Sequence, residues 1–477
     1  MPTVDNRTEP LIGSLDDVEF TFPRGGFTLQ NDTLAECDTP HTAVIPLKCA
    51  ASPCRTASFI SSARRSWRDG RLDDGIRIAE QALHGGCTVD SPCRTEAAFV
   101  LSLLLAQVRR TDHAHAVLDT VDELVQARGD DQLTATATLA RSGVILATGD
   151  FGKAAKLATA GLGEAEQSGL KAWTPLGHFV LAQSALRQGH LSTAVRYTQK
   201  LKEDTVFRRE MLHVGQAAWA VIQIAEAEKG RRHAVLLGAE LLAADTAVRQ
   251  LSIAEPAALP WLVRLMMNSG HKQLAAHGVR ICQQLATENP HFSTVQAAAA
   301  HAAGLYDEDL GKLRLAAESH VDPWAKASAN EDIAVILARG ADDRTTPARD
   351  LQQALDTYTQ TGAWRDASRV ESRLHHSTAD TGVVSRHQRR REIPELTDTE
   401  YAVAHLVAQG FTNGQTAGQL FLSQHTIAFH LRKIFRKLDV ESRVQLASLW
   451  KDLAVRQTGI REHTTSAPAT GWPRLSS

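Results

Sequence analysis

The chain of 477 residues is too long for one hydrophobic core, because single cores stop growing at about 250 to 300 residues. Hydrophobic residues make up 43% and charged residues 22%, which excludes a disordered or fibrous protein. Aromatic residues are only 5%, and the abundant alanine and leucine favour helices over strands. A formal net charge of −2 gives no overall attraction to nucleic acid, so any such site must be a local basic patch.

Residues 1–48 mix Pro, Gly, Thr and Asp without a helical period, and we expect a poorly ordered arm. The arm has no basic region followed by an apolar core, as a secretory signal would have. The longest apolar run, near Ala97 to Ala106, is too short to span a membrane. These features predict a cytoplasmic protein without membrane contact.

Residues 49–376 carry a turn signature that recurs every 38 to 41 residues. In each copy a glycine or polar residue is followed five positions later by a small or aliphatic residue. The copies are Gly70 with Gly75, Gly149 with Ala154, Gly189 with Ala194, Gly270 with Ala275 and Gly311 with Ala316, and weaker ones are Thr111 with Ala116 and Lys229 with Ala234. Independently, the sequence SPCRT at 52–56 recurs at 91–95, each time suiting a helix cap followed by proline at the first helical position.

Each unit predicts a helical hairpin, for example Ala135 to Thr148 followed by Phe151 to Leu162. Because a lone hairpin cannot bury its apolar face, about eight copies predict a curved α-solenoid. The architecture resembles that of tetratricopeptide repeats, although the period near 40 exceeds their usual spacing of about 34 and their aromatic positions are missing. A non-repetitive helical bundle is the alternative.

Residues 377–392 lack apolar periodicity and contain a run of arginines, so they predict a linker. A solvated run is favoured, and contact with DNA phosphates is the alternative. These arginines are Arg386, Arg389, Arg390 and Arg391. Residues 457–477 are rich in Thr, Ser, Pro and Gly and predict a disordered tail.

Residues 393–456 predict a small domain of short helices. Thr397 and Glu400 have the spacing of a capping box, and Gly410 ends the helix that they open. Thr412 caps a second helix that runs to Leu420, and Ser423 caps a third helix. One face of the third helix is apolar: Ile427, Leu431, Ile434 and Leu438.

The opposite face of the third helix is basic, and such a helix fits the major groove of DNA. Residues 384–456 contain eleven Lys and Arg against seven Asp and Glu, a local charge of +4 that leaves −6 for the remainder. This asymmetry puts the positive charge where phosphates would be bound. The residues predicted to read DNA are His425, Thr426, Ala428, Phe429, Arg432, Lys433, Arg436 and Lys437.

The domain closely resembles the LuxR-type helix-turn-helix. The resemblance rests on Leu396-Thr397, Glu400, the stretch 407–413, the stretch 423–427, the stretch 430–434, Lys437-Leu438 and Ser442-Arg443. Residues 430–438 look most like the large ATP-binding members, which place an NTPase and helical repeats before the same head. Because no Gly-x-x-x-x-Gly-Lys-Ser/Thr loop is present, the chain resembles a shortened relative that lacks the NTPase.

The resemblance also implies roles outside the third helix. Supporting DNA contacts fall on Thr412, Asn413, Ser423 and Arg443, and a fourth helix would pair two heads. Its dimerisation stripe comprises Val444, Ala447 and Trp450, although Trp450 could instead complete the core of its own head.

The chain departs from the family pattern in two places. Gly414 and Thr416 replace residues that favour the second helix, and Ala428 is short for a groove-facing position. Base reading would then depend on His425, Phe429 and Arg432, with Phe429 suited to a thymine methyl group.

The sequence therefore predicts a DNA-binding transcription regulator, and the resemblance favours an activator. Its expected partners are double-stranded DNA, a second copy of the chain on DNA, RNA polymerase, and an unknown effector or protein for the solenoid. The alternative is a repeat scaffold that binds proteins through its concave face and has a degenerate head. No motif predicts an enzyme, a cofactor or a metal site. Structural thiols are favoured over zinc ligands or a redox pair for Cys49, Cys54, Cys87 and Cys93.

Overall fold

The computed structural model describes residues 54–85, 92–206, 214–340, 345–379, 396, 398–408, 410–420, 424–440 and 442–450. Within these ranges every regular element is an α-helix and no strand occurs, so the all-α prediction is confirmed. No described helix is long and apolar enough to cross a bilayer. The predicted arm, most of the predicted linker and the predicted tail lie outside these ranges.

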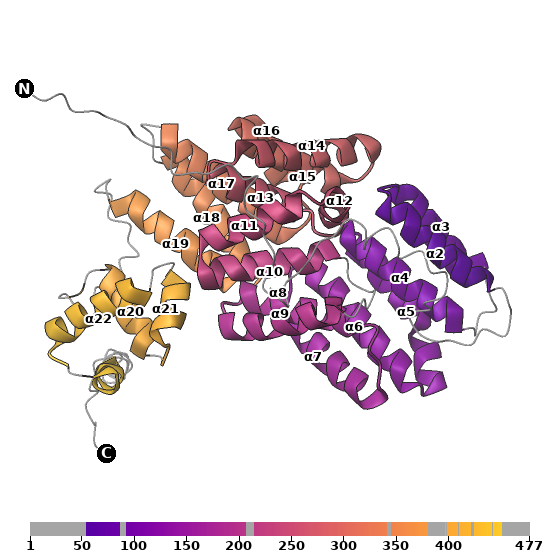
Figure 1. The fold of residues 1–477 in the computed structure, drawn as a ribbon, viewed down its shortest axis with the longest axis horizontal. Helices are drawn as coiled ribbons and strands as arrows, with labels where there is room; N and C mark the ends of the chain where they lie inside the picture. The colour runs from indigo at the N-terminus through magenta and orange to yellow at the C-terminus, as the bar shows by residue number, and fades with distance from the viewer. Residues whose placement is uncertain are drawn as a thin grey trace, which may run out of the picture.

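Eighteen helices between residues 55 and 379, the repeat region, form eight consecutive hairpins and a closing helix (Figure 1). The first four hairpins pair α2 (Arg55–Arg68) with α3 (Leu72–Gly85), α4 (Pro92–Gln107) with α5 (Thr111–Arg128), α6 (Asp131–Thr148) with α7 (Phe151–Ser168), and α8 (Thr174–Arg187) with α9 (Leu191–Val206). The last four pair α10 (Val214–Lys229) with α11 (Arg231–Leu242), α12 (Asp245–Ala254) and α13 (Ala258–Met267) with α14 (Lys272–Glu288), α15 (Ser293–Asp307) with α16 (Leu310–Ser319), and α17 (Pro323–Gly340) with α18 (Thr345–Gln360). Helix α19 (Trp364–Ala379) follows.

The α6–α7 hairpin shows why the sequence folds in this way. The Asp130 carboxylate caps α6 by accepting from two backbone N–H groups, and Asp150 caps α7 through Lys153. Gly149 ends α6 with φ +85°, a left-handed conformation that glycine adopts without strain. The missing side chain of Gly161 lets α7 approach Leu139 closely, since a Cβ there would lie 2.9 Å from the leucine. The two helices therefore pack tightly around small residues.

The predicted period is present in the backbone as well as in the sequence. The turns inside the first seven hairpins each contain one residue with positive φ, and successive ones are 38 to 41 positions apart. These residues are Gly70, Arg109, Gly149, Gly189, Gly230, Gly270 and Glu308. The turn signature thus marks the point where each hairpin reverses.

Three of the predicted turn positions are wrong by one to three residues. The left-handed residue is Arg109 rather than Thr111, Gly230 rather than Lys229, and Glu308 rather than Gly311. At Glu308 the side chain forms an ion pair with Arg339, so a polar residue occupies the conformation that glycine favours. The glycine signal failed here because the turn contains none.

The sixth hairpin departs from the pattern because its first helix is broken. Helix α12 stops at Ala254, and Glu255 adopts φ −131° and ψ 85° before Pro256. A residue before proline is pushed out of the helical conformation, which accounts for the break. Helix α13 then starts at Ala258, and the break places Glu255 at the centre of the molecule, facing Arg109.

The repeated Ser-Pro-Cys-Arg-Thr sequence opens two helices. Pro92 is the first residue of α4, as predicted, whereas α2 begins at Arg55, and Pro53 lies outside the described residues. The Sγ atoms of Cys54 and Cys93 lie 3.5 Å apart and are not joined as a disulfide. Cys49 and Cys87 lie outside the described residues, and no cluster suited to a metal ion occurs among the residues that are described.

The solenoid curves so tightly that its beginning contacts its second half. Helix α2 packs against α12, and α8 packs against α19 (Figure 1). Asn289 accepts from the backbone N–H of Leu72 at 3.2 Å and donates to the carbonyl of Gly70 at 2.8 Å. The turns of the early hairpins therefore point to the inside of the superhelix and meet residues roughly 140 to 220 positions later in the chain.

A buried ionic network occupies this inner side. Arg109 donates to Asp322 at 2.7 and 2.9 Å and pairs with Glu255 at 3.4 Å. Farther along, Glu331 binds Arg369 at 2.6 Å, and Asp332 binds Arg264 at 2.9 Å. Removing charges from water costs several kcal/mol per ion, so such groups persist only when they are paired. The concave side is thus filled largely by the chain itself.

Candidate nucleic-acid interface

Residues 396–450, the head, form a small helical unit with its own core. Its first three helices are α20 (Asp398–Ala408), α21 (Asn413–Leu420) and α22 (Gln424–Leu438), and residues 443–450 form a fourth helical segment. The buried core residues are Leu396, Val403, Ala404, Val407, Ala417, Ile427, Leu431, Ile434 and Leu446. The four-helix arrangement implied by the resemblance is present.

Local signals fix the turn between the first two helices of the head. Gly410 adopts φ +93° after α20, as its predicted role requires. Thr412 Oγ1 accepts from the backbone N–H of Gln415 at 3.3 Å, and Gln415 Oε1 accepts from that of Thr412 at 2.8 Å. This reciprocal cap opens α21. Gln415 was missed in the sequence, although its spacing from Thr412 is the recognisable signal.

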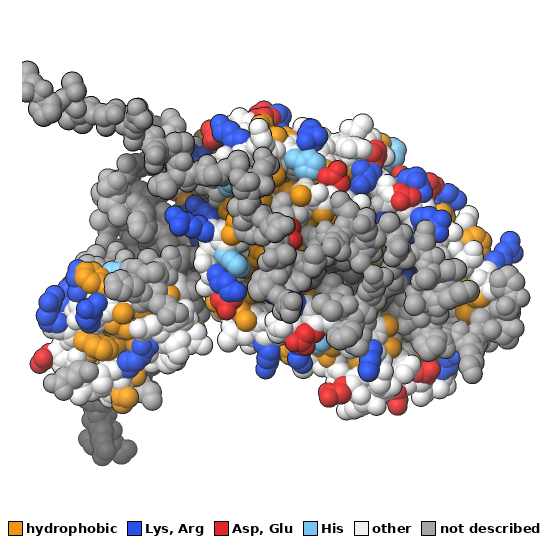
Figure 2. All heavy atoms as spheres, viewed as in Figure 1, with side chains coloured by type: hydrophobic (Ala, Val, Ile, Leu, Met, Phe, Trp, Pro, Cys, Tyr) orange, Lys and Arg blue, Asp and Glu red, His pale blue; other side chains and the backbone are white. Residues whose placement is uncertain are grey.

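Helix α22 has the two faces that its period predicts. Ile427, Leu431 and Ile434 are buried in the core of the head. On the opposite side Phe429 is 45% exposed, and Arg432 and Arg436 are exposed. Figure 2 shows lysine and arginine side chains along the edge of the head where Figure 1 draws α22. A projecting helix with a cationic outer face suits insertion into a groove lined by phosphates.

Short-range contacts orient several of these side chains. The Lys433 ammonium lies 4.4 Å from the centre of the Phe429 ring, a cation–π contact that restrains both. Arg432 Nε donates to the carbonyl of Ala428 at 3.4 Å, which leaves the rest of the guanidinium at the surface. The exposed face therefore presents cations beside one aromatic ring.

Two predicted DNA-contacting cations are engaged inside the head. Lys437 Nζ donates to Glu400 at 2.6 Å and ties the end of α22 to α20. The Arg443 guanidinium donates to Asn413 Oδ1 at 2.6 Å and to the backbone carbonyl of Phe411. Arg443 thus fastens the fourth helix to the start of α21. These contacts favour a positioning role for Lys437, Arg443 and Asn413.

Other predicted site residues are only partly described. His425 and Thr426 lie in the first turn of α22, and nothing is described of their side chains. Ser423 and Thr397 lie outside the described residues. Ala428 is half-buried, so it adds little to the outer face.

The fourth helix divides the predicted dimerisation stripe. Trp450 Nε1 donates to His405 Nδ1 at 3.1 Å and packs on the core of its own head. Leu446, which the sequence interpretation missed, lies one turn before Trp450 and is fully buried. Val444 is 79% exposed and Ala447 is half-buried, so these two residues of the stripe reach the surface of the head.

Two short consecutive helices, α21 and α22, with the second carrying an exposed cationic face, are the arrangement of a helix-turn-helix DNA-binding domain. Residues 394–450 match the family described as bacterial regulatory proteins, luxR family. The C-terminal domain of this chain therefore belongs to the luxR family.

Several regulators share this domain. The chain is 43% identical over 58 residues, 12% of its length, to a nitrate/nitrite response regulator protein homolog of Haemophilus influenzae, covering 28% of that protein. It is 26% identical over 144 residues, 30% of its length, to the nitrate/nitrite response regulator NarL of Escherichia coli, covering 65% of it. An HTH-type transcriptional regulator of Mycobacterium tuberculosis is 32% identical over 96 residues, 20% of this chain and 11% of that protein. The matches cover less than two thirds of each relative.

Proposed function

We propose that the whole chain is a transcription regulator that binds promoter DNA through α22 under control of the repeat region. The carrying observation is the exposed cationic face of α22 within a luxR-family domain. Arg432 and Arg436 would contact DNA, and Phe429 would contact a base edge such as a thymine methyl. His425 and Thr426, at the N-terminal end of the same helix, would enter the groove first.

A homodimer on a two-fold symmetric site is part of this proposal. The exposed Val444 and the neighbouring Ala447 support pairing of two heads, whereas Trp450 serves its own core. We further propose that the protein is an activator that engages RNA polymerase, that it is not an enzyme, and that it is a shortened relative of the large luxR-family regulators.

The test is salt-dependent binding of the full chain to DNA from upstream of its own gene neighbourhood. We expect saturable binding whose affinity falls as salt rises. The Arg432→Ala, Arg436→Ala double variant should bind weakly and lower the slope of log affinity against log salt by about 2, because each arginine neutralises about one phosphate. Affinity and slope would be measured by fluorescence anisotropy.

The matched control is Arg71→Ala, Arg77→Ala, which removes the same charge from the exposed surface around α3. It should bind like the unmodified chain. Folded protein that shows no saturable binding to several neighbouring promoters would overturn the proposal and favour the repeat-scaffold alternative. Equal weakening by both double variants would mean that net charge, not α22, governs binding.

A further inference from the structure

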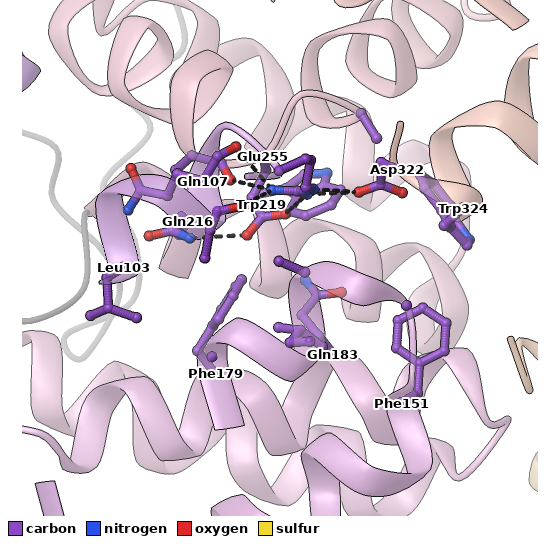
Figure 3. Close-up of a pocket in the computed structure, with 18 of the residues that line it drawn as sticks. Leu103, Gln107, Phe151, Phe179, Gln183, Gln216, Trp219, Glu255, Asp322 and Trp324 are labelled. Carbon is purple, nitrogen blue, oxygen red and sulfur yellow. Dashed lines mark hydrogen bonds and ion pairs between the residues drawn. The ribbon is translucent and has the colours of Figure 1, made fainter. Parts of the chain in front are cut away.

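A cavity lies at the centre of the repeat region, lined by residues of α4, α6, α8 and α10, of the break between α12 and α13, and of the start of α17. It leaves about 80 Å³ for the centres of water-sized spheres, several times the space that one water needs. Figure 3 shows Gln216, Glu255 and Asp322 in one row, with Phe179, Gln183 and Phe151 across the cavity from that row. The cavity lining thus combines carboxylate and amide groups with aromatic rings.

Most polar groups of the lining are held by the protein. Gln216 Nε2 donates to Glu255 Oε1 at 3.0 Å, and Gln183 Nε2 donates to Gln223 Oε1 at 3.2 Å. Arg109 is saturated by two carboxylates and three backbone carbonyls. Although burial disfavours its charge, Asp322 and Glu255 outweigh burial and raise the pKa of Arg109. Arg109 is therefore a structural cation.

The positive charge of Arg187, the other arginine of the cavity lining, is poorly compensated by neighbouring groups. Among the described residues its hydrogen bond is from Nη2 to Gln223 Oε1 at 3.3 Å, and its carboxylate partner, Asp366, is 3.9 Å away. Asp366 already accepts from Arg369 at 2.6 Å and from Trp324 Nε1 at 2.8 Å. A guanidinium carries five N–H donors, so most donors of Arg187 lack a hydrogen bond within the described chain.

The residues around Arg187 favour binding of an anion that carries a planar group. Burial lowers the pKa of Arg187, and Asp366 does not restore it, so an additional negative charge would be stabilising. The guanidinium stacks 3.8 Å from the centre of the Trp324 ring. A second tryptophan of the lining, Trp219, is 3% exposed and has an Nε1 donor without a partner among the described residues. Arg187 and Trp219 both belong to the lining of this one cavity.

We propose that this cavity binds a small organic carboxylate carrying one planar ring system. The carboxylate would accept from Arg187 and Trp219 Nε1, and the ring would pack among Phe151, Phe179 and Trp324. An inorganic anion would leave the space between the aromatic rings unfilled, and a neutral ring would leave the charge of the guanidinium uncompensated. Naming this ligand as the effector rests on the proposed function, whereas its binding does not.

The test titrates the full chain with benzoate, nicotinate and indole-3-carboxylate by calorimetry, each beside the corresponding amide. We expect saturable binding of one carboxylate per chain for at least one of the three, and at least tenfold weaker binding of its amide, because a charged hydrogen bond contributes more than a neutral one. Thermal unfolding should shift upward with the same ligand only. No DNA is present, so failure leaves the DNA-binding proposal untouched.

Three variants complete the test. Arg187→Gln should abolish carboxylate binding, and Trp219→Phe, which breaks no described hydrogen bond, should weaken it three- to tenfold. Arg141→Gln removes the same charge from α6, where Arg141 pairs with Asp119 and Asp122 away from the cavity lining, and should bind normally. The proposal is overturned if the folded chain binds none of the carboxylates, binds the amides as tightly, binds chloride equally well, or keeps its affinity in Arg187→Gln.

Discussion

Thr416 places a hydroxyl inside the core of the head. Its side chain is fully buried, and Oγ1 has no hydrogen-bond partner among the described residues. An unsatisfied buried polar group costs about 1 to 3 kcal/mol, so Thr416→Val, which keeps the shape, should stabilise the head by about 1 kcal/mol. Hydrogen exchange of the full chain, read by mass spectrometry, should slow in peptides from 396–450.

Thr412→Val is the matched control because it removes a hydroxyl that does have a partner. It breaks the bond from the backbone N–H of Gln415 and should cost about 1 kcal/mol, the usual value of a helix cap. Exchange in the same peptides should accelerate. If Thr416→Val also accelerates exchange, the Thr416 hydroxyl stabilises the head and the prediction is wrong.

His320 makes the repeat region sensitive to acid. Burial and the neighbouring His301, whose Nδ1 lies 3.2 Å from His320 Nε2, lower the pKa of His320 to about 3. Asp322 raises this pKa and Arg109 lowers it, both by smaller amounts. The folded state therefore binds a proton less readily than the unfolded chain, whose histidines titrate near 6.5. The stability that depends on neutral His320 is complete above that pH and is lost as the pH falls toward 3.

His320→Gln lacks this titration and should lose less stability on acidification than the unmodified chain. Urea unfolding followed by circular dichroism at about pH 7 and about pH 4.5 measures the difference, since each pH unit in this window corresponds to about 1.4 kcal/mol per proton. Parallel losses in both proteins would show that other groups dominate the acid response.

For single residues, the sequence predicted which way a side chain faces better than it predicted which residue the side chain contacts. The helical period alone assigns Ile427 to the core and Arg432 to the outer face, and both assignments hold. It could not show that Lys437 pairs with Glu400, or Arg443 with Asn413, because those partners are 37 and 30 positions away. A positive charge at the end of a helix is equally consistent with a DNA contact and with an ion pair or hydrogen bond inside the head.

The hairpin is the structural element whose stability depends most directly on single glycines. Gly149 adopts φ +85°, and a Cβ there would lie 3.4 Å from Pro323 and Thr361. Gly149→Ala should destabilise the repeat region by about 1 to 2 kcal/mol, the cost of a left-handed conformation for an L-residue. Thermal and urea unfolding of the full chain would measure the loss.

Gly163→Ala in the same hairpin should have the opposite sign. Gly163 lies within α7, and a Cβ there would meet nothing within 4 Å. Alanine is favoured over glycine in a helix interior by about 1 kcal/mol, so stability should rise. Equal effects of the two substitutions would contradict the assigned turn.

The period therefore predicted the hairpins, and the cap residues predicted several of their ends. The turn at Glu308 was placed three residues late because the turn itself contains no glycine, and the next glycine, Gly311, lies in the first turn of α16. The broken helix before α13 was missed, although Pro256 is a recognisable signal for it. Local patterns predicted which segments are helices. The residues at which helices and turns begin and end depend in addition on tertiary contacts.

For the whole molecule, closure of the superhelix is the feature that local patterns could not reveal. A 40-residue period predicts curvature but not how many hairpins complete a turn. Here the contacts of α2 with α12 and of α8 with α19 complete it within the chain. The polar residues that meet there, such as the buried Arg109 and the largely buried Asp322, are separated by 213 positions and look like ordinary surface charges in the sequence.

Arg109 should therefore control whether the repeat region unfolds as one unit. Arg109→Met leaves Glu255 and Asp322 buried without their cation, a change that typically costs about 3 to 5 kcal/mol. In calorimetry of the full chain, the unfolding transition should move to a lower temperature and become broader as the early hairpins separate from the later ones. Adding Glu255→Gln should recover part of the loss, because burial already raises the pKa of Glu255 and the amide stays neutral.

The comparison that decides this prediction is Arg141→Met. Arg141 also pairs with two carboxylates, but the side chains of Asp119 and Asp122 are 66% and 41% exposed, and both belong to the adjacent helix α5. An exposed pair contributes less than about 1 kcal/mol, so this variant should unfold in one transition near that of the unmodified chain. If Arg109→Met behaves in the same way, closure of the superhelix depends on apolar packing rather than on the buried ion pairs.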